Sequence, residues 1–123
     1  MATQNLTAAD FESTVANNPI VLVDFWAAWC GPCRAFAPTF EASSSKHHEI
    51  VFGKVDTEAE RDLAQAARIR SIPTLMAFRD GIQVYSQPGA LRSPDLERLI
   101  EQVQGLDMDA VRTKLANQQN AGA

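Results

Sequence analysis

The chain has 123 residues, of which 46% are apolar, and its formal net charge is −4. This length fits one domain with a substantial core, and the apolar fraction excludes a wholly disordered chain. The acidic balance and the lack of a basic patch argue against a nucleic-acid partner. No apolar run is long enough to span a bilayer, and residues 1–5 lack the basic and apolar regions of a signal peptide. We therefore expect a cytoplasmic protein that does not bind a membrane.

The first predicted element is a short helix. Thr7 and Asp10 have the spacing of a capping box, and Phe11 and Val15 follow at helical spacing. Asn17-Asn18-Pro19 is expected to end this helix, because proline disfavours helical backbone in the residue before it.

Residues 20–26 form an apolar run with the length and branching of a strand that is buried on both faces. Asp24 interrupts this run. Burial disfavours the charged form of a carboxylate, so we expect a pKa above the ordinary value of ~3.9. One interpretation is a hydrogen-bonded structural residue. The one we favour is a general base that acts through a water molecule on Cys33, because Asp24 lies six residues before Cys30 on the same strand-to-helix unit.

The only two cysteines, Cys30 and Cys33, stand where this strand gives way to a helix. Residues three apart at a helix start face the same side, so the two sulfurs can reach bonding distance. The free N–H groups and positive dipole of the helix start favour a thiolate, the form that attacks disulfides. The pair therefore indicates a redox-active dithiol.

The two cysteines are expected to differ in role. Cys30 precedes the first helical turn, so we assign it as the exposed nucleophile and Cys33 as the resolving thiol. Gly31 would let a partner's backbone come close, and Pro32 fits the first turn of a helix. Trp29 would give a flat apolar patch for docking.

Three other interpretations of the cysteine pair fit the sequence less well. A zinc site needs four ligands, whereas the chain has no second cysteine pair, and its histidines, His47 and His48, are adjacent and expected to face solvent. A static structural disulfide is not needed at this size and would be unusual in a reducing compartment. Inert buried thiols would leave the surrounding Trp, Gly and Pro unexplained.

The pattern continues with a helix over residues 34–46 that contains Pro38 and is expected to bend there. Residues 50–56 predict a second buried strand. Its Lys54 is either a partner for Asp24 on the neighbouring strand or a surface lysine at a strand end. A capping box at residues 57–60 predicts a helix over 57–67.

Pro73 is expected to begin the next strand, residues 75–78, since it cannot sit within a central ladder. Asp80-Gly81 predicts a hairpin turn to a strand over 82–86. Residues 93–95 cap a helix that ends near Gly105, a short helix follows over 107–117, and residues 118–123 are expected to fray. This order of helices and strands along the chain predicts an α/β fold with a mixed sheet and helices on both faces.

Taken together, these motifs resemble the thioredoxin family. Residues 23–33, Val-Asp-Phe-Trp-Ala-Ala-Trp-Cys-Gly-Pro-Cys, match its active-site motif almost residue for residue. Further matches lie across residues 6–104. Pro38 matches the family's helix-kinking proline, and Lys54 matches its lysine near the buried aspartate. Ile72-Pro73-Thr74 matches its cis-proline motif, and Gly81 and Gly89 match its two hairpin glycines.

The resemblance implies a sheet of four or five strands and a cis Pro73 that faces the cysteines. The carbonyl of Ile72 would then align a substrate strand. The resemblance further implies reduction by thioredoxin reductase with NADPH upstream, many client disulfides downstream, and a monomer without a bound cofactor or metal. The expected site comprises catalytic Cys30, Cys33, Asp24 and Lys54 and substrate-binding Trp29, Gly31, Pro32, Ile72, Pro73 and Gly89.

The chain departs from the family pattern at a few positions. Arg68 replaces a glycine at the end of a helix, and Ser71 and Pro88 alter the rim around the cysteines. Residues 105–123 have no counterpart in the minimal family domain, so we divide the chain into a thioredoxin domain, 1–104, and a C-terminal extension.

Two classes of function follow. The first is a protein-disulfide reductase and electron carrier that works through a mixed disulfide of Cys30. The second is a binding or structural subunit whose thiols are incidental. An oxidase or isomerase would be expected from other residues between the cysteines than Gly31-Pro32.

Overall fold

The computed structural model describes residues 2–121. Its strands are β1 (Thr3–Asn5), β2 (Ile20–Trp26), β3 (Val51–Asp56), β4 (Thr74–Arg79) and β5 (Ile82–Pro88). Its helices are α1 (Phe11–Asn17), α2 (Gly31–Lys46), α3 (Arg61–Ala66), α4 (Ser93–Gln104) and α5 (Met108–Ala121). None of the described helices is long and apolar enough to cross a membrane.

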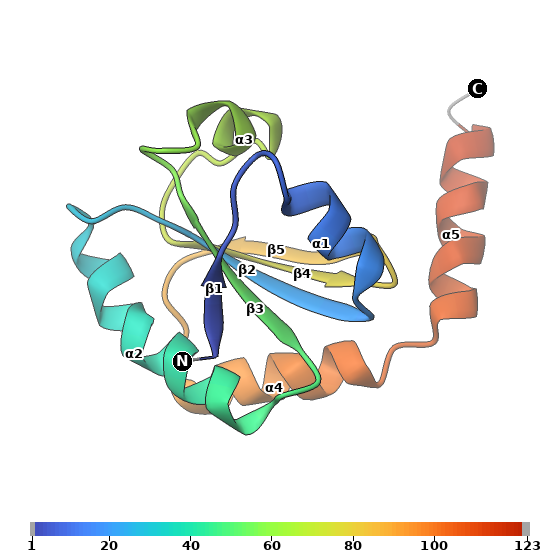
Figure 1. Ribbon diagram of the computed structural model, residues 1–123. Helices are drawn as coiled ribbons and strands as arrows, with labels where there is room; N and C mark the ends of the chain where they lie inside the picture. The colour runs from blue at the N-terminus through green and yellow to red at the C-terminus, as the bar shows by residue number, and fades with distance from the viewer. Residues whose placement is uncertain (1, 122–123) are drawn as a thin grey trace.

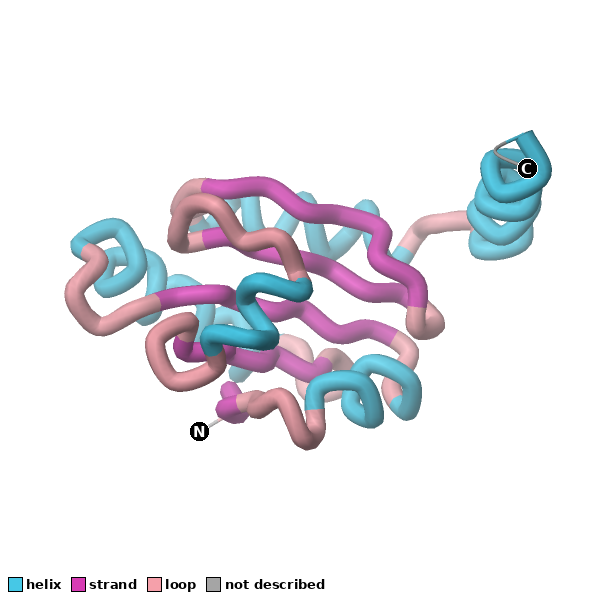
Figure 2. The backbone as a smooth tube through the Cα atoms, turned by 90° about the horizontal axis from the view of Figure 1, so that it is seen from above, coloured by secondary structure: helices cyan, strands magenta, loops and turns pink. Residues whose placement is uncertain are grey.

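The strands form one sheet in the order β1-β3-β2-β4-β5. β3 pairs in parallel with both β1 and β2, whereas β4 pairs antiparallel with β2 and β5. Figures 1 and 2 show helices on both faces of this sheet, with α2 and α4 on one face and α1 and α3 on the other. The predicted α/β fold with a mixed sheet is therefore confirmed.

The central position of β2 explains its continuous apolar sequence. Leu22 packs into the core beneath α2 and α4, together with Phe36, Phe40, Leu96 and Ile100. The side chains of Val21, Val23 and Phe25 belong to the second core, on the face of α1 and α3. Because successive side chains of a strand point to opposite faces, a strand covered on both sides needs apolar residues at nearly every position.

Several elements differ from the sequence prediction. β1 was not predicted, because a three-residue edge strand of Thr, Gln and Asn carries no apolar alternation. α3 begins at Arg61 rather than at residue 57, since Asp56 Oδ1 accepts the N–H groups of Glu58 and Ala59 and holds these residues in a separate turn. α5 continues to Ala121 where fraying was expected, and residues 122–123 of that predicted tail lie outside the described part of the chain.

The β4–β5 hairpin follows the predicted turn. Asp80 and Gly81 both have positive φ, 54° and 80°, between the paired residues Arg79 and Ile82. Two consecutive positive φ values define the tight turn that matches the twist of paired strands, and Asp-Gly is among the sequences that favour it.

The end of α3 shows how the chain accommodates Arg68. Its φ is 59°, its N–H donates to the carbonyl of Gln65, and the N–H of Ile69 donates to the carbonyl of Ala64. These two bonds make a Schellman motif, in which glycine is the usual residue at the left-handed position. Arg68 therefore adopts the glycine conformation, at a cost in backbone strain of about 1 kcal/mol.

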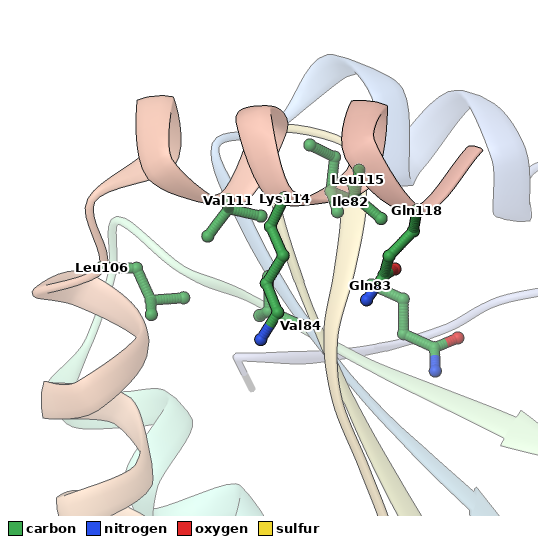
Figure 3. Close-up of a pocket in the computed structure, with 8 residues that line it drawn as sticks. All are labelled: Ile82, Gln83, Val84, Leu106, Val111, Lys114, Leu115 and Gln118. Carbon is green, nitrogen blue, oxygen red and sulfur yellow. The ribbon is translucent and has the colours of Figure 1, made fainter. Parts of the chain in front are cut away.

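α5 lies at the opposite end of the molecule from the start of α2 (Figures 1 and 2). Arg112 connects it to the hairpin turn through an ion pair with Asp80 at 3.1 Å. A groove of about 300 Å³ separates α5 from β5, and Figure 3 shows Lys114 extending across it toward Val84. Neither cysteine lines this groove.

Candidate active site

The cysteine pair sits at the junction between β2 and α2, as predicted. Cys30 is the N-cap of α2, its Sγ accepts the N–H of Cys33 at 3.2 Å, and Pro32 lies in the first turn. Cys30 and Cys33 form a disulfide with their Cα atoms 5.2 Å apart. A sulfur that accepts a helix N–H is stabilised as a thiolate when the disulfide is reduced. The site is therefore equipped to exchange between dithiol and disulfide.

The exposure of Cys30 differs from expectation. Its exposed fraction is 4%, close to the 2% of Cys33, so the expectation of an exposed nucleophile is wrong for the disulfide form. The reason is local, because the Cys30 sulfur is bonded to Cys33 on one side and lies 3.6 Å from the carbonyl oxygen of Ile72 on another.

The loop before β4, which contains Ile72 and Pro73, lies beside the cysteine pair. The Ile72–Pro73 peptide bond is cis, as the family resemblance implied, and Pro73 directly precedes β4. The N–H of Gly89 donates to the carbonyl of Pro73 at 2.8 Å, which brings the end of β5 beside this loop. A Cβ at Gly89 would meet no atom, but its φ of 107° strongly favours glycine. The fold thus brings Ile72, Pro73 and Gly89 together.

Trp29 is the surface feature of this site. It is the one large apolar side chain among the described residues that is exposed, at 67%, and its Nε1 donates to Glu58 Oε1 at 2.7 Å. Gly31 and Pro32, next to it in sequence, are also exposed. An exposed aromatic ring beside a disulfide gives an apolar surface on which another chain can dock.

Asp24 is completely buried in β2, with an exposed fraction of 0%. Both of its carboxylate oxygens lack a hydrogen-bond partner among the described residues. Burial raises the pKa of Asp24 from 3.8 to about 7, and the positive charge of Lys54 opposes this rise. The predicted direction of the pKa shift is confirmed.

Lys54 aligns with Asp24 in the β2–β3 register but makes no hydrogen bond to it. Its Nζ lies 4.9 Å from the centroid of the Trp26 ring instead. This position leaves the ammonium at a hollow lined by Trp26, Asp56 and Glu60, whereas contact with Asp24 would require burial of the charge. Of the two interpretations of Lys54, the direct pair with Asp24 is therefore not formed, and Lys54 acts on Asp24 only through its charge at longer range.

The described residues include no group of three or more His, Cys, Asp or Glu side chains that could hold a metal ion. His47 does not face solvent as expected, because its Nε2 lies 2.6 Å from Glu97 Oε1 and its ring stacks on Phe52. His47 thus connects the end of α2 to α4.

Sequence reasoning missed a hollow beside Trp29. It has a volume of about 320 Å³ and is lined by Trp29, Thr57, Ala64, Ile69, Arg70, Ser71 and Ile72. Trp29 precedes α2, Ala64 lies in α3, and the others come from the loops on either side of α3, so only the fold brings them together. The sole indication in the sequence was the position of Arg70 and Ser71 just before Ile72-Pro73.

Comparisons with known proteins agree with this geometry. The thioredoxin family model matches residues 2–102. The chain is 51% identical to "Putative thioredoxin 2" of Streptomyces coelicolor over 118 residues, which covers 96% of this chain and 88% of that protein. It is 40% identical to thioredoxin-1 of Saccharomyces cerevisiae over 90 residues, covering 73% of this chain and 87% of the yeast protein.

A solved structure of Plasmodium falciparum thioredoxin superposes with a TM-score of 0.76 at 36% identity, covering 81% of this chain and 98% of that one. The family match, the relatives and the disulfide at the helix start together identify a protein-disulfide reductase that works through a redox-active cysteine pair. The protein is accordingly a thiol–disulfide oxidoreductase, and its chain belongs to the thioredoxin family.

Proposed function

We propose that Cys30 is the attacking thiol in the reduction of client disulfides. The Cys30 thiolate attacks one client sulfur, a mixed disulfide forms, and the other client sulfur leaves as a thiolate. The observation that supports this assignment is the position of Cys30 at the N-cap, where its Sγ accepts the Cys33 N–H at 3.2 Å. Cys33 lies inside the first turn and is the resolving thiol.

In the second step the Cys33 thiolate attacks the Cys30 sulfur. The internal disulfide re-forms, the second client sulfur leaves as a thiolate, and two electrons have passed from the protein to the client. Asp24 takes the Cys33 proton through a water molecule. A carboxylate with a pKa of about 7 suits this task, because it accepts and releases a proton near neutral pH.

Lys54 has a supporting role in this proposal. Its charge lowers the pKa of Asp24 against the effect of burial, without a direct ion pair. The ammonium thereby keeps the carboxylate available as a base at neutral pH.

Client segments dock on the surface formed by Trp29, Gly31, Pro32, Ile72, Pro73 and Gly89. Trp29 supplies apolar area, and Gly31 leaves room for an approaching backbone. The Ile72 carbonyl, 3.6 Å from Cys30 Sγ, is placed to accept an N–H from a client strand beside the reacting sulfur.

The oxidised protein is returned to its dithiol by thioredoxin reductase with NADPH, so the chain acts as an electron carrier in the cytoplasm. We propose that it does so as a monomer, with residues 1–104 carrying the chemistry. These assignments follow from the thioredoxin family rather than from a particular contact.

Insulin reduction with NADPH and a thioredoxin reductase tests the function. Wild type should reduce insulin rapidly, and Cys30→Ser should lose measurable turnover. Cys33→Ser should accumulate a mixed disulfide through Cys30, whereas the double variant, as the control, should not. Equal slow rates for wild type and Cys30→Ser would instead favour a binding or structural subunit with incidental thiols. Trapping through Cys33 rather than Cys30 would overturn the assignment of the two cysteines.

A further inference from the structure

We propose that Arg70 selects client segments that carry an acidic residue a short distance from the cysteine under attack. This inference rests on the proposed function, because it concerns the segment that Cys30 attacks. The site is the hollow of about 320 Å³ beside Trp29, here called the α3 groove, whose lining includes Thr57, Ala64, Ile69 and Ile72.

The α3 groove is continuous with the reactive disulfide. Trp29 is the residue before Cys30, and the carbonyl of Ile72 lies 3.6 Å from Cys30 Sγ. A client chain that reaches Cys30 past Ile72 therefore runs directly into this groove. The groove is thus placed to receive a client segment, and its half-exposed apolar side chains offer area for that segment to cover.

Charge distinguishes this groove from a generic apolar surface. The Arg70 side chain is exposed, and it makes no hydrogen bond or ion pair with the residues that the structure describes. Arg70 is the one charged residue among those that line the groove, and Glu58, which accepts the Trp29 N–H at 2.7 Å, is paired with Arg61 at 3.3 Å. The charge that an incoming chain meets in the groove is therefore positive.

The spacing indicates where the acid should lie in the client. Arg70 precedes Ile72 by two residues, and an extended chain advances about 3.3 Å per residue. A client that passes Ile72 and continues along the groove would thus meet Arg70 about two or three residues from its cysteine, on one side only. A guanidinium binds a carboxylate with two parallel N–H···O bonds, which favours Glu or Asp over neutral residues.

The test uses disulfide-containing peptides that differ only in carrying Glu, Gln or Lys two or three residues before or after the cysteine. Single-turnover reduction by the pre-reduced protein is measured, so the reductase does not limit the rate. Wild type should reduce Glu peptides about twofold to fivefold faster than Lys peptides, a range typical of exposed charge pairs, and only on one side of the cysteine. The preference should weaken with added salt.

Arg70→Gln should remove the preference and Arg70→Glu should reverse it. Arg98→Gln, which removes a similar charge from an ion pair with Asp95 on α4, is the matched control and should leave the preference intact. A wild type without preference, or an unchanged preference in Arg70→Glu, would overturn the inference. The Gln peptide distinguishes a failure of the Arg70 inference from a failure of the proposed function. If wild type did not reduce the Gln peptide, the proposed function itself would be refuted.

Discussion

The cysteine end and the α5 end of this molecule are held together in different ways. At the cysteine end, Asp24 is buried with both oxygens unpaired, and Trp26 Nε1 also lacks a hydrogen-bond partner among the described residues. At the α5 end, Arg79 Nη1 donates to the carbonyls of Val103, Gln104 and Leu106, and Arg112 pairs with Asp80.

The difference concerns where the chain tolerates unfavourable interactions. An unpaired buried carboxylate destabilises a fold, and it is found in the strand that leads to the disulfide. The groove beside α5, in contrast, is lined by no buried charged side chain. We propose that the cysteine end gives up stability for chemistry, whereas the α5 end adds modest stability and is dispensable for the chemistry.

The largest expected effect comes from Asp24→Asn. The folded state binds the Asp24 proton more tightly than the unfolded state, because burial raises the pKa from 3.8 to about 7. The stability linked to that proton is fully present below pH 3.8 and is lost as pH rises through about 7. The variant should therefore gain about 4 kcal/mol over wild type between acid and alkaline pH.

Denaturant unfolding from pH 3 to pH 9, with turnover measured alongside, checks this prediction. Release of the mixed disulfide should slow, because the base for Cys33 is gone. Asp109→Asn, at a fully exposed position on α5, is the control and should follow wild type. Full activity combined with lower stability at neutral pH would make Asp24 an ordinary structural residue.

Removal of the C-terminal extension should have a smaller effect. A chain that ends at Gln104 lacks the buried Met108 and the half-buried Val111 and Leu115. The unfolding free energy should fall by at most a few kcal/mol, and reductase turnover should persist. The comparison of the two ends would fail if the truncated protein folded normally but had no turnover.

The sequence predicted the central features of the fold because they follow from local patterns. The apolar run at residues 20–26 marked β2, and Asp80-Gly81 marked the hairpin. The capping pattern at residues 57–60 misplaced the start of α3, because Asp56 holds the preceding turn. β1 was missed, since its three residues are held by pairing with β3 rather than by any pattern of their own.

The candidate site was predictable in its residues but not in its contacts. The cysteines, the buried Asp24 and the proline loop are all recognisable by type and spacing. The position of Lys54 over Trp26 depends on how two strands and a ring pack, which sequence does not specify. The α3 groove likewise exists only because the loops beside α3 fold toward Trp29.

A still smaller effect is expected for Arg68→Gly, at the end of α3. Glycine adopts a φ of 59° without strain, so the variant should be more stable by about 1 kcal/mol. Thermal and denaturant unfolding measure the gain, with turnover as the second readout. Unchanged turnover would show that this strain does not serve the chemistry, and a loss of stability would contradict the assigned backbone conformation.

The pKa of Asp24 is the quantity on which the comparison of the two ends depends most directly, and carbon NMR of its side-chain carboxyl can titrate it in the oxidised protein. We expect an inflection near pH 7, and a higher one in Lys54→Met, because the opposing charge is removed. An inflection near the ordinary value of 3.8 would contradict the account. Asp24 would then be ionised well below neutral pH, and it would neither destabilise the cysteine end near pH 7 nor serve as the base for Cys33.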